Sequence, residues 1–323
     1  MYIYFKKISI LKLFDKNKKM KLNEDNIYMK IFNNSEITII SIFPSGNIIL
    51  GLIDNSILIY EKTLNIIQKI PNVHDLSLNY INIKDENNFV TCSHDLNIKT
   101  WIKKNIENES KFFINQTIYY AHYYTINKLL YCQNGNIISC SKDCKVKIWE
   151  ERNNKLYQYK TIITHSYEVY SILLFEDKKI LISFGFDGIK FHNLYNLERF
   201  YYNTNIKSKE YTILKRLDND RIIICDGYMI QIISISTKEI IKEIENGFFI
   251  YDICIIENKG LFLVGGEYKD IKVYKCDNYE YIKIIKNVFN GNYIYGLFDL
   301  INNMILMNNQ NSFVISNLNK LLN

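Results

Sequence analysis

Three residues of the types that perform nucleophilic catalysis lie close together in the chain. His122, Ser139 and Asp143 could supply the base, the nucleophile and the orienting acid for hydrolysis of an acyl bond. However, the same set recurs in the chain at similar spacing, whereas a catalytic set occurs once. The sequence also has no G-x-S-x-G segment, the sharp turn that exposes a serine nucleophile. We therefore expect a structural role for these residues.

The segment around Asp143 is one copy of a repeat. ISCSKDCKVKIWEE (138–151) is matched by FVTCSHDLNIKTW (89–101), and both place a hydroxyl residue before a turn aspartate and a tryptophan after it. ILISFGFDGIKFH (180–192) keeps the serine and the aspartate, and His192 stands at the tryptophan position. Weaker copies begin at residues 48, 222, 261 and 305.

Each copy follows another strand-like run that begins 11 residues earlier. These runs begin near Ile37, Leu78, Ile126, Val169, Tyr211, Ile250 and Ile294. The runs are short, rich in β-branched residues and bounded by Asn, Asp and Gly, which is typical of strands rather than helices. Seven units, most of them about 40–45 residues long, predict an all-β fold, a seven-bladed β-propeller of four-stranded antiparallel blades.

A histidine precedes the first strand of three units. His74, His122 and His165 stand 21, 21 and 22 residues before the turn aspartates of their units. With this histidine, the aspartate and the tryptophan, the chain resembles the WD-repeat family over about residues 26–320. The signature dipeptides of the family, Gly-His and Trp-Asp, are not intact, since the chain has Ala121-His122 and Trp149-Glu150.

The resemblance implies a buried hydrogen-bond network in which the histidine binds the aspartate and a Ser or Thr links it to the indole N–H. Its members would be His122, Asp143, Ser139 and Trp149 in one unit, His74, Asp95, Thr91 and Trp101 in a second, and His165, Asp187 and Ser183 in a third. Such bonds satisfy polar groups whose burial without a partner costs about 1–3 kcal/mol each.

The two ends of the chain predict how the ring closes. The last unit lacks an outer strand, because only residues 316–323 follow its third strand. Residues 27–32 (IYMKIF) form an additional strand-like run, and we expect this N-terminal strand to close the ring by pairing with the last blade. The predicted domains are a basic N-terminal extension, 1–25, and a propeller, 26–323.

The charge and the cysteine content limit which kinds of partner and which cellular compartment can be expected. Of the net charge of +6, residues 1–36 hold +4, from eight lysines and four acids. Only four of the 40 basic residues are arginines, so nucleic acid is not the expected partner of the ring. Seven cysteines, an odd number, without a signal peptide predict the cytoplasm, with the nucleus as an alternative. No apolar run is long enough to span a membrane.

The sequence predicts neither a metal nor a cofactor. Cys140 and Cys144 flank the turn at Asp143, but a structural zinc site needs four ligands, and no matching pair is present. Walker A, G-x-G-x-x-G and H-E-x-x-H motifs are also absent from the sequence.

Aromatic residues gather where the first strands of several units begin, the end at which partners often dock in the WD-repeat family. They are candidates for binding partners because aromatic side chains are enriched at hot spots of interfaces. These candidate partner-binding residues are Tyr170, Phe249, Tyr251, Tyr293 and Tyr295.

We therefore expect a non-catalytic scaffold or adaptor that binds other proteins or peptides, as a monomeric subunit of a larger complex. Two alternatives stay open. One is an enzyme of propeller fold, with acids or a metal in the central channel. The other is a protein that binds nucleic acid or an anionic surface through its basic N-terminus.

Overall fold

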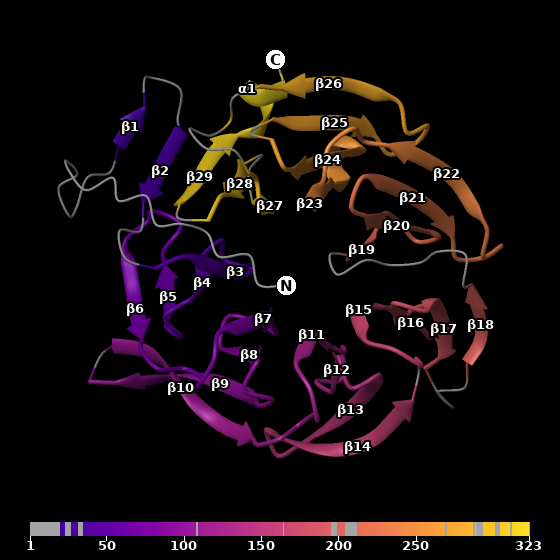
Figure 1. Ribbon diagram of the computed structural model, residues 1–323. Helices are drawn as coiled ribbons and strands as arrows, with labels where there is room; N and C mark the ends of the chain where they lie inside the picture. The colour runs from indigo at the N-terminus through magenta and orange to yellow at the C-terminus, as the bar shows by residue number, and fades with distance from the viewer. Residues whose placement is uncertain are drawn as a thin grey trace, which may run out of the picture.

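The chain forms seven antiparallel β-sheets arranged in a ring around a central channel (Figure 1). This computed structural model describes residues 20–22, 27–31, 35–107, 109–163, 165–194, 199–203, 212–268, 270–286, 288, 293–300, 304–310 and 312–322. Each sheet is one blade of a β-propeller, and consecutive blades follow one another around the ring.

The first six blades have four strands each, in the order of the chain. Blades one to three consist of β3 (Ile37–Ile42), β4 (Ile48–Leu52), β5 (Ile57–Tyr60), β6 (Ile66–Ile70), β7 (Leu78–Ile83), β8 (Asn88–Ser93), β9 (Ile98–Ile106), β10 (Glu109–Ile118), β11 (Ile126–Tyr131), β12 (Ile137–Ser141), β13 (Lys145–Arg152) and β14 (Lys155–Ile163). Blades four to six consist of β15 (Val169–Phe175), β16 (Ile180–Gly185), β17 (Gly188–Asn193), β18 (Arg199–Asn203), β19 (Thr212–Arg216), β20 (Arg221–Asp226), β21 (Met229–Ser234), β22 (Ile240–Glu245), β23 (Ile250–Ile256), η1 (Glu257–Lys259), β24 (Leu261–Gly266), β25 (Ile271–Lys275) and β26 (Tyr281–Ile285).

The seventh blade has three strands from the C-terminal part of the chain, β27 (Gly296–Leu300), β28 (Met304–Asn308) and β29 (Ser312–Asn317). A short helix, α1 (Leu318–Leu322), follows. The strand order continues past β29 to β2 (Ile27–Ile31) and β1 (Met20–Leu22). Residues 1–19, 23–26 and 32–34, which flank and join these strands, lie outside the described residues, as does much of the predicted extension 1–25. Closure by the N-terminal strand therefore stays a prediction, as does the boundary of the extension.

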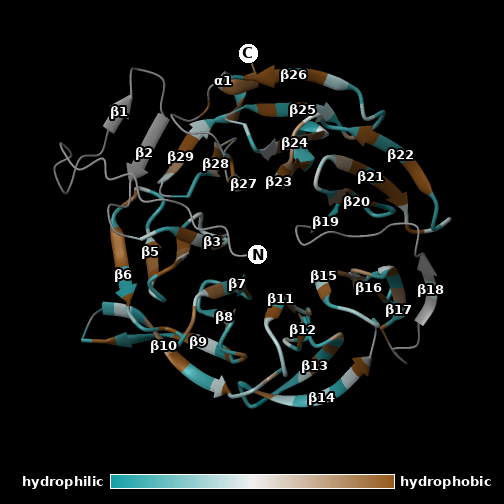
Figure 2. Cartoon of the chain, in the orientation of Figure 1, coloured by the Kyte–Doolittle hydropathy of each residue, from teal (hydrophilic) through white to brown (hydrophobic). Residues whose placement is uncertain are grey.

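The second strand of each blade lies between two neighbouring blades, which explains its composition. All residues of β4 (IILGL) and β12 (IISCS) are buried, because both faces of these strands pack against another sheet. A continuous apolar run bounded by turns is the sequence pattern of such a strand. The outer strands face solvent, and exposed isoleucines occur on β6, β22 and β26, seen as brown stretches at the rim in Figure 2.

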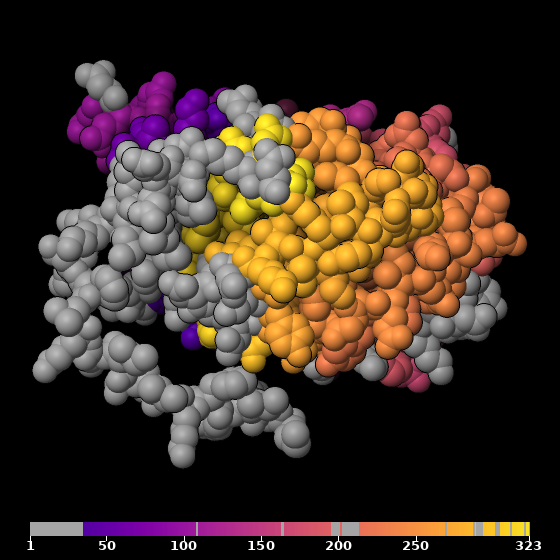
Figure 3. All heavy atoms as spheres, turned by 90° about the horizontal axis from the view of Figure 1, so that it is seen from above, coloured from indigo at the N-terminus to yellow at the C-terminus, as the bar shows by residue number. Residues whose placement is uncertain are grey.

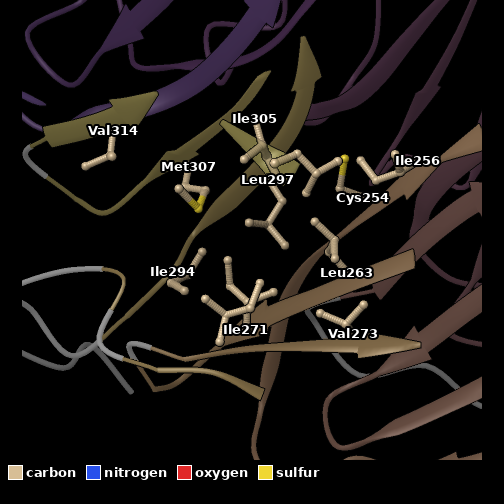
Figure 4. Close-up of a cluster of buried hydrophobic side chains, with 12 residues drawn as sticks. Cys254, Ile256, Leu263, Ile271, Val273, Ile294, Leu297, Ile305, Met307 and Val314 are labelled. Atoms are coloured by element: carbon tan, nitrogen blue, oxygen red, sulfur yellow. The ribbon is translucent and has the colours of Figure 1, made fainter. Parts of the chain in front are cut away.

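Among the described residues, the buried hydrophobic side chains form seven clusters, and each cluster lies between two neighbouring blades. Figure 4 shows the cluster between the sixth and seventh blades, where Leu263 and Val273 face Leu297 and Met307. The cluster between the seventh and first blades contains Tyr60 and Phe313, whose ring centroids lie 6.0 Å apart. The first and last blades thus pack together as the other neighbours do. Figure 3 shows the ring from its edge, with the last blades, orange and yellow, facing the viewer.

The structure confirms the all-β, seven-bladed propeller of mostly four-stranded blades. Five of the seven first strands begin at the predicted residue, and the fifth begins at Thr212, beside Tyr211, which lies outside the described residues. The last begins at Gly296, two residues after the predicted Ile294. The N–H of Ile294 donates to the carbonyl of Gly266 at 2.8 Å, so this residue is bound to the sixth blade before the seventh begins.

Candidate functional site

The third blade places four polar side chains in one buried network. Nδ1 of His122 lies 2.9 Å from Oδ2 of Asp143, and its Nε2 lies 2.7 Å from Oγ of Ser139. The indole N–H of Trp149 donates to the same Ser139 oxygen at 2.8 Å. The loop before β11, the second strand, the turn and the third strand each contribute one member, so the network joins the parts of one blade.

The second blade repeats this arrangement. Nδ1 of His74 lies 2.8 Å from Oδ2 of Asp95, and its Nε2 lies 2.8 Å from Oγ1 of Thr91. The indole N–H of Trp101 donates to Thr91 Oγ1 at 3.0 Å. A threonine hydroxyl therefore takes the place of the serine hydroxyl without a change in connectivity.

The fourth blade carries a variant in which a second histidine replaces the tryptophan. His165 binds Asp187 through Nδ1, and its Nε2 lies 2.9 Å from Oγ of Ser183. On the other side of Ser183, Nε2 of His192 lies 3.0 Å from the same oxygen. His192 is buried, so it occupies the core position that a tryptophan holds in blades two and three.

The chemistry of the partners orients every hydrogen in the network. A carboxylate only accepts, so His122 donates Nδ1–H to Asp143, and Nε2 of the neutral imidazole accepts from the Ser139 hydroxyl. The serine oxygen then accepts the indole N–H of Trp149. In the fourth blade the same logic makes Nε2 of His192 a donor to Ser183, as the indole is elsewhere.

The shifts in pKa agree with this protonation state. Burial lowers the pKa of His122 and outweighs the opposite effect of Asp143, so the imidazole is neutral at pH 7. For Asp143, burial raises the pKa, but the hydrogen bond from His122 and those from the backbone N–H groups of Tyr123 and Lys145 outweigh burial. The pKa of Asp143 is therefore below its usual range, and the carboxylate is ionised.

The arrangement of these residues does not suit nucleophilic catalysis. A serine nucleophile must touch its substrate, yet Ser139 is 0% exposed and its oxygen lies between His122 and Trp149. Ser183 and Thr91 are likewise fully buried. Their hydroxyls connect the strands of a blade, which is a structural use of the same residue types.

A lysine two residues before the aromatic position belongs to the network in several blades, and the prediction from sequence missed it. Nζ of Lys147 donates to the carbonyl of Ala121 at 2.6 Å, and Nζ of Lys99 donates to that of Val73 at 2.7 Å. Both carbonyls precede the network histidine, so the lysine fixes the loop that carries it. The pattern K-x-W, which occurs at residues 99–101 and 147–149, could have indicated this lysine in the sequence.

The sixth blade keeps only part of this design. Lys272 donates to the carbonyl of Asn246, and the Tyr274 hydroxyl lies 3.3 Å from Oδ1 of the same asparagine. Asn246 is fully buried. The pattern K-x-Y at residues 272–274 thus corresponds to K-x-W. A direct hydrogen bond from Tyr274 to Asn246 replaces the bonds that run through histidine and a hydroxyl in blades two and three.

Four of the five predicted partner-binding residues lie together near the beginnings of β23 and β27. The ring centroids of Phe249 and Tyr251 are 5.3 Å apart, those of Tyr251 and Tyr295 are 4.9 Å apart, and those of Tyr293 and Tyr295 are 5.9 Å apart. The fifth candidate, Tyr170, lies on β15 of the fourth blade and is separated from the others by the fifth blade.

A further aromatic residue, which the sequence did not single out, extends this group. Tyr228 lies in the turn between β20 and β21, and its ring centroid is 5.5 Å from that of Phe249. We call Tyr228, Phe249, Tyr251, Tyr293 and Tyr295 the aromatic ridge. It runs from the fifth to the seventh blade, and Tyr228, Tyr293 and Tyr295 are 48%, 37% and 38% exposed.

A cavity of about 410 Å³ lies beside the ridge, among the first strands of several blades. Tyr251 and Tyr295 form part of its wall, and Ser41, Tyr80, Lys215 and Asp252 form other parts. Nζ of Lys215 lies 3.1 Å from Oδ1 of Asp252, and the other oxygen of Asp252 accepts the Leu297 N–H at 3.0 Å. The cavity therefore combines an aromatic edge with a charged interior.

In the part of the chain that the structure describes, no group of three or more His, Cys, Asp or Glu side chains is placed to hold a metal ion. Cys140 is buried, Cys144 is partly buried, and both are free thiols. Among the same residues, none of the helices has the length and hydrophobicity of a membrane-spanning segment.

Ring, blades and network together define a β-propeller in which blades two and three carry a His–Asp–Ser/Thr–Trp relay and blade four carries a variant of it. A family model described as WD domain, G-beta repeat, matches residues 114–150, which hold Ser139, Asp143 and Trp149. The chain is a member of the WD40 repeat family with a seven-bladed propeller. A search of curated proteins gave no match. Propellers of this family typically serve as interaction scaffolds and are usually not catalytic.

Proposed function

We propose that this protein is a non-catalytic scaffold or adaptor that binds another protein or a peptide through the aromatic ridge. One observation carries the proposal: five aromatic rings from three blades touch in sequence, and three of them are more than one-third exposed. Aromatic side chains supply large apolar contact areas and are enriched where interfaces have their binding energy.

The position of the ridge supports this function. The ridge lies at the end of the blades where the first strands begin, and it borders the cavity of about 410 Å³. A partner that covers the ridge can therefore also place a side chain in the cavity, and the combination of an anchor and a pocket is typical of hot spots.

The biological context belongs to the same proposal. We expect the protein to act as one subunit of a larger complex in the cytoplasm or the nucleus, which the seven free thiols support. We also expect the N-terminal strand to complete the last blade and residues 1–25 to extend from the ring. The alternative function, binding of nucleic acid or an anionic surface, depends on this extension. Most of its residues lie outside the described part of the chain.

Recovery of partners from the native host tests the proposal. Wild type is compared with Tyr251→Ala/Tyr295→Ala and with a control, Tyr157→Ala/Tyr159→Ala, whose tyrosines are exposed on the outer strand β14. We expect the ridge variant to lose the proteins that wild type and control both retain. Equal recovery by a folded ridge variant would show that partners bind elsewhere.

A further inference from the structure

The channel beside the cavity contains a lysine whose charge the fold does not neutralise. Lys128 lies on β11, which lines the channel, and its Nζ lies 3.2 Å from the hydroxyl of Ser171 on β15. The same Nζ lies 6.0 Å from the ring centroid of Tyr80 on β7. Among the described residues Lys128 makes no ion pair, although its side chain is half-buried.

The charged groups around Lys128 leave the channel with a net positive charge. Lys215 on β19 also faces it, and Asp252 on β23 is already paired with Lys215 at 3.1 Å. Burial raises the pKa of Tyr80 and of the Cys140 thiol to about 12, so both are neutral at pH 7. Two ammonium groups thus share one carboxylate.

The shortage of negative charge affects the pKa of Lys128. Burial, together with the nearby charge of Lys215, lowers the pKa of Lys128 to about 8 and outweighs the opposite effect of Asp252. Lys215 differs, because Asp252 overcomes its burial and raises its pKa. An ammonium group that is half-buried without a counter-ion gains free energy when an anion reaches it.

Two residues of the cavity wall are neighbours of this charge. Tyr80 and Lys215 form part of the cavity wall, and both are neighbours of Lys128. Tyr251 and Tyr295 also belong to this wall, so a side chain that enters the cavity beside the aromatic ridge would lie in the same space as these two neighbours of Lys128.

We propose that this part of the channel binds the carboxylate of an aspartate or glutamate side chain of a partner polypeptide, with Lys128 as the ligand that becomes paired. The inference rests on the proposed function, since the aromatic ridge would hold the segment that carries the carboxylate. Charge complementarity favours an acidic occupant, and the adjoining rings favour a polypeptide over a small free anion, which has no apolar part to pack on them.

Two pools of synthetic octapeptides test the inference on the immobilised full-length protein. Both pools are randomised around one fixed central residue, which is Asp in one pool and its neutral isostere Asn in the other. We expect wild type to retain the Asp pool about tenfold better than the Asn pool. Lys128→Gln should lose this preference, whereas Lys128→Arg, which keeps a cation, and Lys104→Gln, on the exposed end of β9, should keep it.

The pH dependence has a defined sign. The preference should weaken as the pH rises through about 8, because Lys128 then loses its proton, while Tyr80 and Cys140 do not titrate in this range. Thermal unfolding of Lys128→Gln should occur at or above the temperature of wild type, since the substitution removes an unpaired charge.

Three results would overturn the inference. The first is equal retention of the two pools, and the second is an Asp preference that survives in Lys128→Gln. The third is competition by succinate as strong as that by the Asp peptides, because it would indicate a site for small anions. The proposed function is judged separately. If both pools bind equally but are lost from Tyr251→Ala/Tyr295→Ala, the aromatic ridge binds polypeptides and only the carboxylate site is wrong.

Discussion

The indole nitrogen of Trp149 lies 2.8 Å from Oγ of Ser139, a residue of the neighbouring strand of the same blade. The hydroxyl is fully buried and stands between a donor, Trp149, and an acceptor, Nε2 of His122 at 2.7 Å. One oxygen atom therefore links the third strand of the blade to the loop that precedes its first strand.

Removal of this hydroxyl should be costly. Ser139→Ala leaves both the indole N–H and the imidazole Nε2 without a partner in the core, so we expect a loss of about 2–3 kcal/mol in the free energy of unfolding. Urea denaturation measures it. The control is Ser110→Ala on the exposed start of β10, which should cost less than about 0.5 kcal/mol. Similar small losses at both positions would contradict a stabilising relay.

The lysine of the K-x-W pattern should also stabilise the blade. Lys147→Met keeps a long unbranched side chain but removes Nζ, which donates to the Ala121 carbonyl and lies 5.7 Å from the centroid of the Trp149 ring. We expect a loss of about 1–2 kcal/mol in the free energy of unfolding. Lys104→Met, at an exposed position of β9, serves as the control and should be close to neutral. If Lys147→Met had the same free energy of unfolding as wild type, the hydrogen bond to the loop would make no net contribution to stability.

Stability should fall in mild acid because of His122. Its pKa is lowered in the folded protein, so between that value and about 6.5 the unfolded chain binds a proton that the folded protein does not. This contribution to stability is complete above about pH 6.5 and decreases as the pH falls. Urea denaturation between about pH 7.5 and 5.5 should show a smaller slope for His122→Gln than for wild type. Burial lowers the pKa of His94 as well, so part of the slope should remain in the variant; an unchanged slope would be inconsistent with a neutral, buried His122.

Gly266 should be essential for the shape of the aromatic ridge. A Cβ atom at this position would overlap the backbone carbonyl of Phe249, which cannot rotate away as a side chain could. Gly266→Ala should therefore displace Phe249, destabilise the fold by about 2 kcal/mol or more, and weaken partner binding. Thermal unfolding and partner recovery measure the two effects. Wild-type behaviour in both assays would show that the backbone there is not fixed.

The sequence predicted the propeller because its strongest signals are local and recur. The first strand, the turn aspartate and the aromatic position of a blade lie within one repeat, so their spacing, together with the resemblance to the WD-repeat family, was sufficient to group His122, Asp143 and Trp149. The proximity of residues at non-equivalent positions of different blades could not be obtained in this way. The charge of Lys215 acts on Lys128 although β11 and β19 belong to the third and fifth blades. The repeat spacing of the sequence does not predict that these two residues lie near one another.

The aromatic ridge illustrates the same limit within the candidate site. Phe249, Tyr251, Tyr293 and Tyr295 occupy equivalent positions of adjacent blades, so alignment of the repeats brought them together. Tyr228 lies in a different part of its blade, the turn after β20, and only the packing of the fifth blade against the sixth places it against Phe249.

The most direct test of the account is a photocrosslink from the aromatic ridge to its partner. A photoreactive phenylalanine replaces Tyr295 in one variant and Tyr159, on the outer strand β14, in another, and each is irradiated in the native host. We predict a covalent adduct with a partner protein from position 295 and none with that protein from position 159. Adducts with the partner from position 159 alone, or equally from both positions, would contradict docking on the ridge.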